Sequence, residues 1–110
     1  MVDVERRKYE RRKIELAATV YEKDRKIPVS IIDISSGGVG LLSLEVINPG
    51  SKIKIVLSHT DKYAIGGTVQ WVMLIYTDGT DDLDGKFQYR MGVKANEVLD
   101  TEDILNDSSL

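Results

Sequence analysis

The sequence predicts an all-β fold, a small six-stranded antiparallel β-barrel followed by a short tail. Apolar and polar residues alternate with a period of two from residue 14 onward, which is typical of strands with one buried face. Six such runs follow one another with short turns between them and no long helical pattern. A closed barrel is favoured because an open sheet of short strands would leave its apolar face and its edges uncovered.

The first three strands follow from alternation and from two turns. One face of the first run carries Ile14, Leu16, Ala18 and Val20. The EKDR segment at residues 22–25 turns the chain, and one face of the second run carries Ile27, Val29 and Ile31. Glycines at positions 37, 38 and 40 then lead into a third strand that contains Val39 and Leu41.

The last three strands are separated by two further turns. Pro49-Gly50 is a turn signal, because proline presets the first turn dihedral and glycine tolerates positive φ. The next run carries Ile53, Ile55 and Leu57, and a long run from Tyr63 to Tyr76 places Val69, Trp71 and Met73 on one face. We expect Trp71 to fill the barrel; the alternative is a partly exposed indole that stacks on a base. A polar loop, DGTDDLDG, precedes the final run with Phe87, Tyr89, Met91 and Val93.

The composition limits the classes of function. A chain of 110 residues is long enough for one domain with one core. The absence of cysteine excludes disulfides, zinc–thiolate sites and thiol catalysis, and it fits a reducing compartment. No apolar run approaches the roughly 20 residues that a membrane span needs. We therefore expect a cytoplasmic protein without a membrane span.

The charges are distributed unevenly along the chain. The net charge is −3, yet residues 6–13 carry six basic side chains and one glutamate, and every charge from Glu97 to Leu110 is acidic. An acidic chain argues against DNA or RNA coating, and a local basic segment fits capture of a compact anion. We divide the chain into a flexible arginine-rich arm at 1–13, a barrel at 14–96 and an acidic tail at 97–110, where Thr101 would cap a short helix.

The arm carries two arginines with a spacing of four, Arg7 and Arg11, and Arg6 and Arg12 flank them. Arginine presents a planar fork of donors that matches phosphate oxygens and the O6/N7 edge of guanine. On a looped arm this spacing lets two forks converge on one ligand. Taken alone, the RxxxR pair is a weak signal, and a solvated basic leader is the favoured interpretation.

The second motif is the turn DISSGG at residues 33–38. The Asp33 carboxylate suits the N1–H and N2 donors of guanine, and the Ser35 hydroxyl suits a phosphate or a base edge. Gly37 and Gly38 let the backbone approach a ligand closely. An ordinary turn in which Asp33 caps its own backbone is the alternative, but arm and turn together offer the donors and acceptors that guanine needs.

In these residues the chain resembles the PilZ domain family, small β-barrel modules that bind the bacterial second messenger cyclic di-GMP. The family signatures RxxxR and [D/N]xSxxG match residues 7–11 and 33–38, and the runs GTVQW at 67–71 and YRMGV at 89–93 are also similar. The resemblance implies a split barrel and a cyclic di-GMP receptor without catalytic activity or a cofactor. It implies that Arg7 and Arg11 hold guanine and phosphate, Asp33 bonds the guanine edge, Ser35 contacts a base or phosphate, and Gly38 keeps the turn tight. Arg6 would add a contact.

The mechanism that the resemblance implies is ordering of the arm over the ligand, which presents a new surface to an unidentified protein partner. The protein would act as a monomer or a dimer. The alternative is a protein–protein adaptor on the same barrel that binds no nucleotide. We set aside His59 as a metal ligand or base, because it is the only histidine, and DGTDDLDG as a calcium loop, because it fails the EF-hand pattern.

Overall fold

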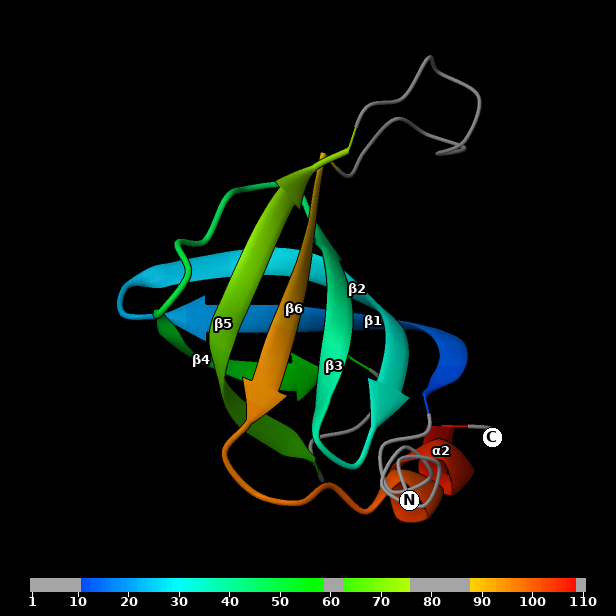
Figure 1. The fold of residues 1–110 in the computed structure, drawn as a ribbon. Coiled ribbons are helices and arrows are strands. Elements are labelled where there is room, and N and C mark those ends of the chain that lie inside the picture. The colour runs from blue at the N-terminus through cyan, green and yellow to red at the C-terminus, as the bar shows by residue number, and fades with distance from the viewer. Residues whose placement is uncertain (1–10, 59–62, 76–87, 109–110) are drawn as a thin grey trace, which may run out of the picture.

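Within residues 11–58, 63–75 and 88–108, which the computed structural model describes, six antiparallel strands close into a barrel (Figure 1). The strand order around the barrel is β1-β2-β3-β6-β5-β4. This architecture confirms the predicted fold class. The elements are β1 (Arg12–Glu22), β2 (Arg25–Ser35), β3 (Gly38–Ser43), β4 (Lys52–Leu57), β5 (Ala64–Leu74), β6 (Tyr89–Ala95) and the helix α2 (Thr101–Ser108).

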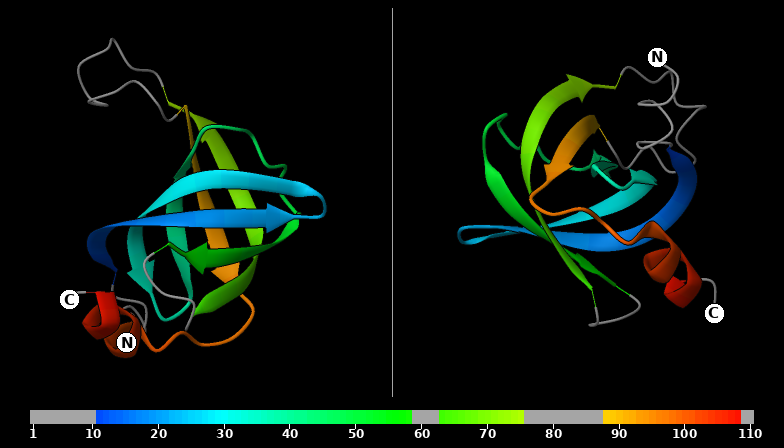
Figure 2. Two further views of the ribbon diagram at one scale, coloured as in Figure 1. Left: turned by 180° about the vertical axis from the view of Figure 1, so that it is seen from behind. Right: turned by 60° about the horizontal axis from the view of Figure 1, so that its bottom comes forward.

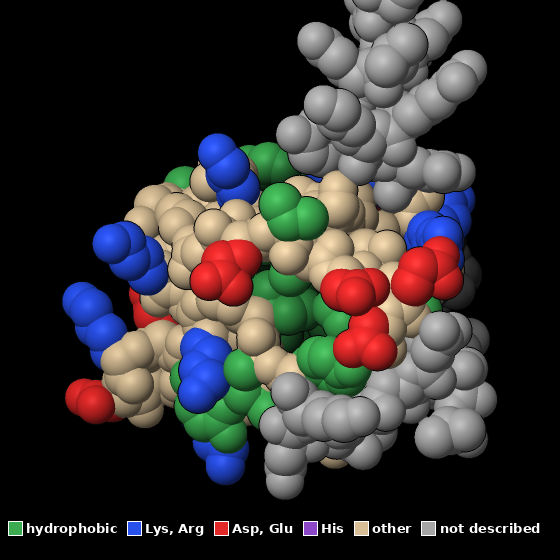
Figure 3. Space-filling model, turned by 90° about the horizontal axis from the view of Figure 1, so that it is seen from below, with side chains coloured by type: hydrophobic (Ala, Val, Ile, Leu, Met, Phe, Trp, Pro, Cys, Tyr) green, Lys and Arg blue, Asp and Glu red, His purple; other side chains and the backbone are tan. Residues whose placement is uncertain are grey.

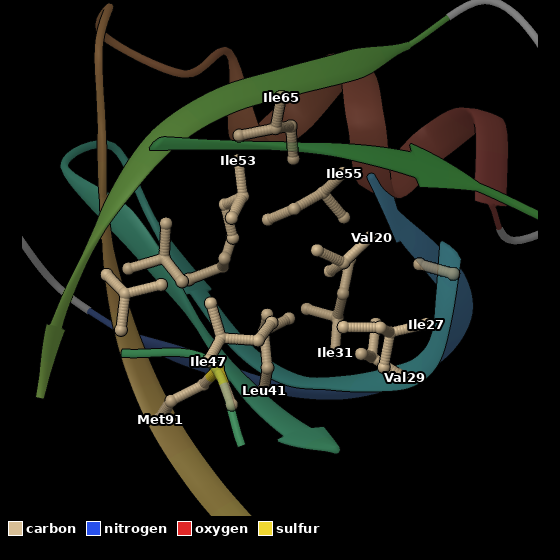
Figure 4. Packing of buried hydrophobic residues seen from close by; sticks show 14 of the residues in the cluster. Val20, Ile27, Val29, Ile31, Leu41, Ile47, Ile53, Ile55, Ile65 and Met91 are labelled. Atoms are coloured by element: carbon tan, nitrogen blue, oxygen red, sulfur yellow. The ribbon is translucent and has the colours of Figure 1, made fainter. Parts of the chain in front are cut away.

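The barrel interior is filled by the alternating apolar side chains, and each strand contributes to it (Figure 4). The faces predicted for the second and fourth runs are confirmed, since their apolar residues are at most 5% exposed. Burial of apolar side chains is the main favourable term in folding, so this interior holds the barrel together. The labelled residues of Figure 4 that point inward include Val20, Ile27, Ile31, Leu41, Ile55 and Met91.

Two tight turns follow the predicted signals. The β1–β2 hairpin turns at Lys23, which has a φ of 54°, a conformation that short hairpin turns require. The turn at Pro49-Gly50 closes with a hydrogen bond of 3.1 Å from the N–H of Ser51 to the carbonyl of Asn48. Gly50 has a φ of 91°, which glycine adopts without strain.

A β-bulge in β2 interrupts the alternation beside the DISSGG motif. Ile31 pairs with Leu41 and Asp33 pairs with Gly40, so β2 has one more residue than β3 at this point. Because of the extra residue, the next buried position after Ile31 is Ile34. Strict alternation from Ile27 through Ile31 would have sent Asp33 into the core; the bulge instead leaves its carboxylate on the outer side of the barrel.

A second bulge, in β5, makes one prediction wrong. Val69 pairs with Val93 and Trp71 pairs with Gly92, so Gln70 is the extra residue. The indole of Trp71 therefore turns outward and is 43% exposed, where the sequence predicted a core position. The alternative interpretation, a partly exposed indole, is the one that the structure supports.

Helix α2 lies at the lower end of the barrel in Figure 1 and is capped by Asp100. The N–H of Asp103 donates to Asp100 Oδ1 at 3.0 Å, so Thr101 is the first helical residue and not the cap that the sequence predicted. Leu99 and Ile104, which flank this cap, both pack on the core as a hydrophobic staple.

Two polar contacts fasten α2 to the barrel. Arg12 Nη2 lies 2.5 Å from Glu102 Oε2, and the hydroxyl of Tyr63 donates to Asp103 Oδ2. The predicted short C-terminal helix is thus present, and it packs on the barrel through Ile104, which is 4% exposed. In the part of the chain that the structure describes, no helix is long and apolar enough to cross a membrane.

Candidate functional site

The DISSGG motif forms the turn between β2 and β3, and Ser35 holds it in shape. The Ser35 hydroxyl accepts a hydrogen bond from the N–H of Gly37 at 3.3 Å and donates to the carbonyl of Gly38 at 3.5 Å. The residue is 2% exposed, so this hydroxyl is engaged inside the turn. Its direct contact with a ligand stays a prediction.

Position 38 requires a glycine because β3 and β6 approach closely there. A Cβ at this position would stand 2.1 Å from the carbonyl oxygen of Val93 on β6, and backbone atoms cannot give way as a flexible side chain would. The tightness of the turn therefore comes from strand packing. The Gly38 position keeps the end of β3 against β6.

We expect Gly38→Ala to lower the free energy of unfolding by about 1–3 kcal/mol, a typical cost of forcing extra volume into a packed site. Urea denaturation followed by circular dichroism measures the loss. Gly66→Ala is the matched control, because the nearest atom to its Cβ would be Asn96 Nδ2 at 3.0 Å, the end of a flexible side chain. Equal losses in the two variants would contradict the assignment.

A cross-strand row of residues shapes the outer face beside this turn. Asp33 on β2 pairs with Gly40 on β3, Gly40 pairs with Gly92 on β6, and Gly92 pairs with Trp71 on β5. A Cβ on Gly40 would lie 2.8 Å from both carboxylate oxygens of Asp33, and one on Gly92 would lie 2.4 Å from the indole Nε1 of Trp71. The carboxylate and the indole therefore lie over neighbouring glycines, on strands about 4.8 Å apart.

Two arginines converge on the Asp33 carboxylate. Arg11 Nη1 lies 2.6 Å from Oδ1, and Arg90 Nη2 lies 3.7 Å from Oδ2. The Asp33 side chain is 13% exposed and the Arg11 side chain is 57% exposed. An ion pair with one partner this open to water contributes on the order of 1 kcal/mol or less, so a ligand with suitable donors can replace Arg11 there.

A groove of about 350 Å³ runs over this face, and we call it the Trp71 groove. Arg11 stands on its wall, Trp71 offers an exposed aromatic surface, and Lys94 adds a second cation. This combination of an aromatic surface, cations and close backbone suits a planar base carrying phosphate. The groove is lined by Arg11, Ser35, Gly37, Gly38, Gln70, Trp71, Gly92, Val93 and Lys94.

The structure brings together the site residues that the sequence predicted within its described part. Arg11, Ser35 and Gly38 line the Trp71 groove, and Asp33 is joined to it through Arg11. Arg6 and Arg7 lie outside the described residues, as do His59, Phe87 and the DGTDDLDG loop. Their roles stay predictions.

Several residues of this face were not predicted as site residues, among them Gly40, Gly92, Arg90 and Lys94. A glycine inside a strand marks a place where another group approaches closely, so Gly40 and Gly92 carried a usable signal. Arg90 and Lys94 carried none, because their place beside Asp33 or in the groove depends on the register between β6 and its neighbours.

The comparisons with known proteins agree with this geometry. A family model of the PilZ domain matches residues 5–105, which is nearly the whole chain. The chain belongs to the PilZ domain family. PilZ domains are binding or adaptor modules, so membership of the family supports either a module related to cyclic di-GMP or an adaptor.

Among solved structures, this PilZ domain is similar to the Bacillus subtilis inhibitor of motility (MotI/DgrA), with a TM-score of 0.59 and 12% sequence identity. The match covers 88% of this chain and 46% of the other, so this PilZ domain spans about half the length of that protein. At this identity the likeness concerns the fold. A search of curated proteins found no match.

Proposed function

We propose that this PilZ domain is a receptor for cyclic di-GMP that signals to a partner protein and has no catalytic activity. The observation that carries the proposal is the cross-strand row in which the Asp33 carboxylate, flanked by Arg11, and the Trp71 indole lie over two neighbouring glycines. Guanine needs hydrogen-bond acceptors on one edge, donors on the other, and a surface for its ring. All three requirements meet on this face.

In the proposed complex, Asp33 exchanges one partner for another. The guanine N1–H and N2 amino groups would donate to the Asp33 carboxylate, with which Arg11 now pairs at 2.6 Å. Arg11, once released, would turn its fork to the O6/N7 edge or to a phosphate, and a bidentate contact of this kind is worth about 1–3 kcal/mol. The negative charge of Asp33 keeps a cationic partner, because Arg90 Nη2 lies 3.7 Å from Asp33 Oδ2.

The groove supplies the remaining contacts. Trp71 would stack on a guanine ring, and Lys94 would lie near the phosphates. Arg7, with Arg6 beside it, would reach the ligand from the arm, since Arg11 ties the start of β1 to this face. Folding of the arm over the ligand would give the partner a new surface.

Isothermal titration calorimetry with cyclic di-GMP tests the proposal. We expect a dissociation constant of 1 µM or lower, which corresponds to about −8 kcal/mol or better. GTP and a short guanine-rich oligonucleotide at the same concentration serve as ligand controls. A response to every nucleic acid that fades steeply with salt would indicate general nucleic-acid binding instead, and no heat with cyclic di-GMP would favour the adaptor.

A further inference from the structure

A second hollow, of about 360 Å³, lies at the lower end of the barrel, and we call it the acidic hollow. Its floor is apolar, with Ile65 from β5, Leu99 from the β6–α2 connection and Ile104 from α2. In Figure 3, which views the barrel from below, hydrophobic side chains lie deep in a hollow and acidic side chains stand around it. Ile65 and Ile104 are themselves buried, at 3% and 4% exposed. Figure 2 shows the β6–α2 connection crossing this end of the barrel.

The rim of the acidic hollow is negatively charged. Glu97 and Asp100 line it, and Glu102 and Asp103 follow in the first turn of α2. Glu102 pairs with Arg12 and Asp103 accepts a hydrogen bond from Tyr63, whereas the exposed Glu97 has no ion pair among the described residues. Every charge in the sequence from residue 97 onward is acidic, so a partner at this end meets a negative field.

An apolar side chain stands exposed at the same place. Val98 lines the hollow and is 86% exposed, the largest value among the exposed large hydrophobic residues that the structure describes. One exposed valine needs no explanation by itself. Val98, next to the partly buried Leu99 and an acidic rim, indicates a contact surface with an apolar centre and a charged margin.

Backbone hydrogen bonds connect the acidic hollow to the β2–β3 turn beside the Trp71 groove. The N–H of Leu99 donates to the carbonyl of Ser36 at 2.9 Å, and the N–H of Ala95 donates to the carbonyl of Gly37 at 2.9 Å. Leu99 lines the hollow and Gly37 lines the groove. A ligand that moves the β2–β3 turn would therefore act on the β6–α2 connection through these two hydrogen bonds.

We propose that the acidic hollow is the docking surface for a basic segment of a partner protein, which inserts an apolar side chain between β5 and α2. Lysine or arginine residues of the segment pair with Glu97 and Asp100 on the rim, and the inserted side chain covers Ile65 and Ile104. The charge of the rim selects a basic partner, and the exposed Val98 with the partly buried Leu99 offers it apolar contact. Control of docking by cyclic di-GMP rests on the proposed function and would act through the β2–β3 turn.

A library of random peptides displayed on phage, selected against the immobilised full chain, tests the docking surface. We expect the selected peptides to share an apolar residue flanked by lysine or arginine. Their binding to the protein in solution should weaken as salt is raised, and it should shift the amide resonances of Ile65, Gly66 and Leu99. Acidic or uncharged consensus peptides, or shifts confined to other surfaces, would overturn the proposal.

Two variants separate the apolar and the charged parts of the surface. We expect Val98→Asn and Glu97→Lys each to weaken the selected peptide at least fivefold, and neither change removes a buried side chain. Val46→Asn is the matched control, because Val46 is 44% exposed and belongs to the β3–β4 connection at the other end of the barrel (Figure 1). An unchanged affinity in both test variants would overturn the proposal. The proposal would also be overturned if the wild-type protein self-associated and these variants abolished the self-association. The occupant of the hollow would then be a second copy of this chain.

A final experiment tests whether the ligand controls docking. We expect saturating cyclic di-GMP to change the peptide affinity about fivefold or more, which is within the usual range of coupling between sites. No change would overturn the coupling while the docking surface stands. A wild-type protein that selects basic peptides but binds no cyclic di-GMP would refute the proposed function alone, so the two failures are distinguishable.

Discussion

Replacing Arg7 and Arg11 together by alanine is expected to remove detectable binding of cyclic di-GMP. Each arginine is assigned a bidentate contact worth about 1–3 kcal/mol, so the double variant loses about 2–6 kcal/mol. A loss near 4 kcal/mol takes a dissociation constant of 1 µM to about 1 mM, beyond the range of routine calorimetry. The measurement is the titration used for the wild type, with the same protein concentration.

The stability of this double variant should change little. The Arg11 side chain of the Arg11–Asp33 pair is about half open to water, and Arg90 still pairs with Asp33 after Arg11 is removed.

Arg25→Ala is the matched control for binding. Arg25 is 41% exposed, bonds Glu22 and Glu45 at 2.9 Å, and lies at the tip of the β1–β2 hairpin. We expect this control to bind within about twofold of wild type. Undiminished binding by the double variant would refute the role of the arm.

The apolar alternation was sufficient to predict the barrel, because its signal lies in residues two apart on one strand. Ile27, Val29 and Ile31 fill the core as that pattern requires. The same rule failed at Trp71, where it placed the indole inside. An extra residue in β5, Gln70, shifts the phase there, and nothing in the local sequence announces the shift.

The two halves of the site differ in how far the sequence could reveal them. Asp33 and Arg11 were found because each lies in a short local motif. The neighbouring positions of Gly40 and Gly92 depend on the register between β3 and β6, strands that are far apart in the sequence. The bulges in β2 and β5 shape this face, since one leaves Asp33 outside the core and the other turns Trp71 outward. These two departures from simple alternation therefore coincide with the candidate site.

Trp71→Ala is expected to weaken cyclic di-GMP binding by about 5- to 150-fold, the equivalent of the 1–3 kcal/mol that stacking of one base on an aromatic side chain contributes. Trp71 is the only tryptophan of the chain, so its fluorescence reports directly on this contact. We expect quenching of the wild-type emission as the ligand is added. Because the indole is 43% exposed, the variant should unfold at nearly the wild-type temperature by circular dichroism.

Gly92→Ala separates the position of the indole from its presence. A Cβ at residue 92 would lie 2.4 Å from Trp71 Nε1 and 2.6 Å from Trp71 Cε2, so the ring must leave its place over β6. We therefore expect Gly92→Ala to lose affinity about as much as Trp71→Ala does, and to lose the ligand-induced quenching although the tryptophan is retained. Trp71→Phe, which keeps a smaller ring at the same place, should retain part of the affinity. If Gly92→Ala binds and quenches like the wild type, the indole does not act from this position, and the base must stack elsewhere.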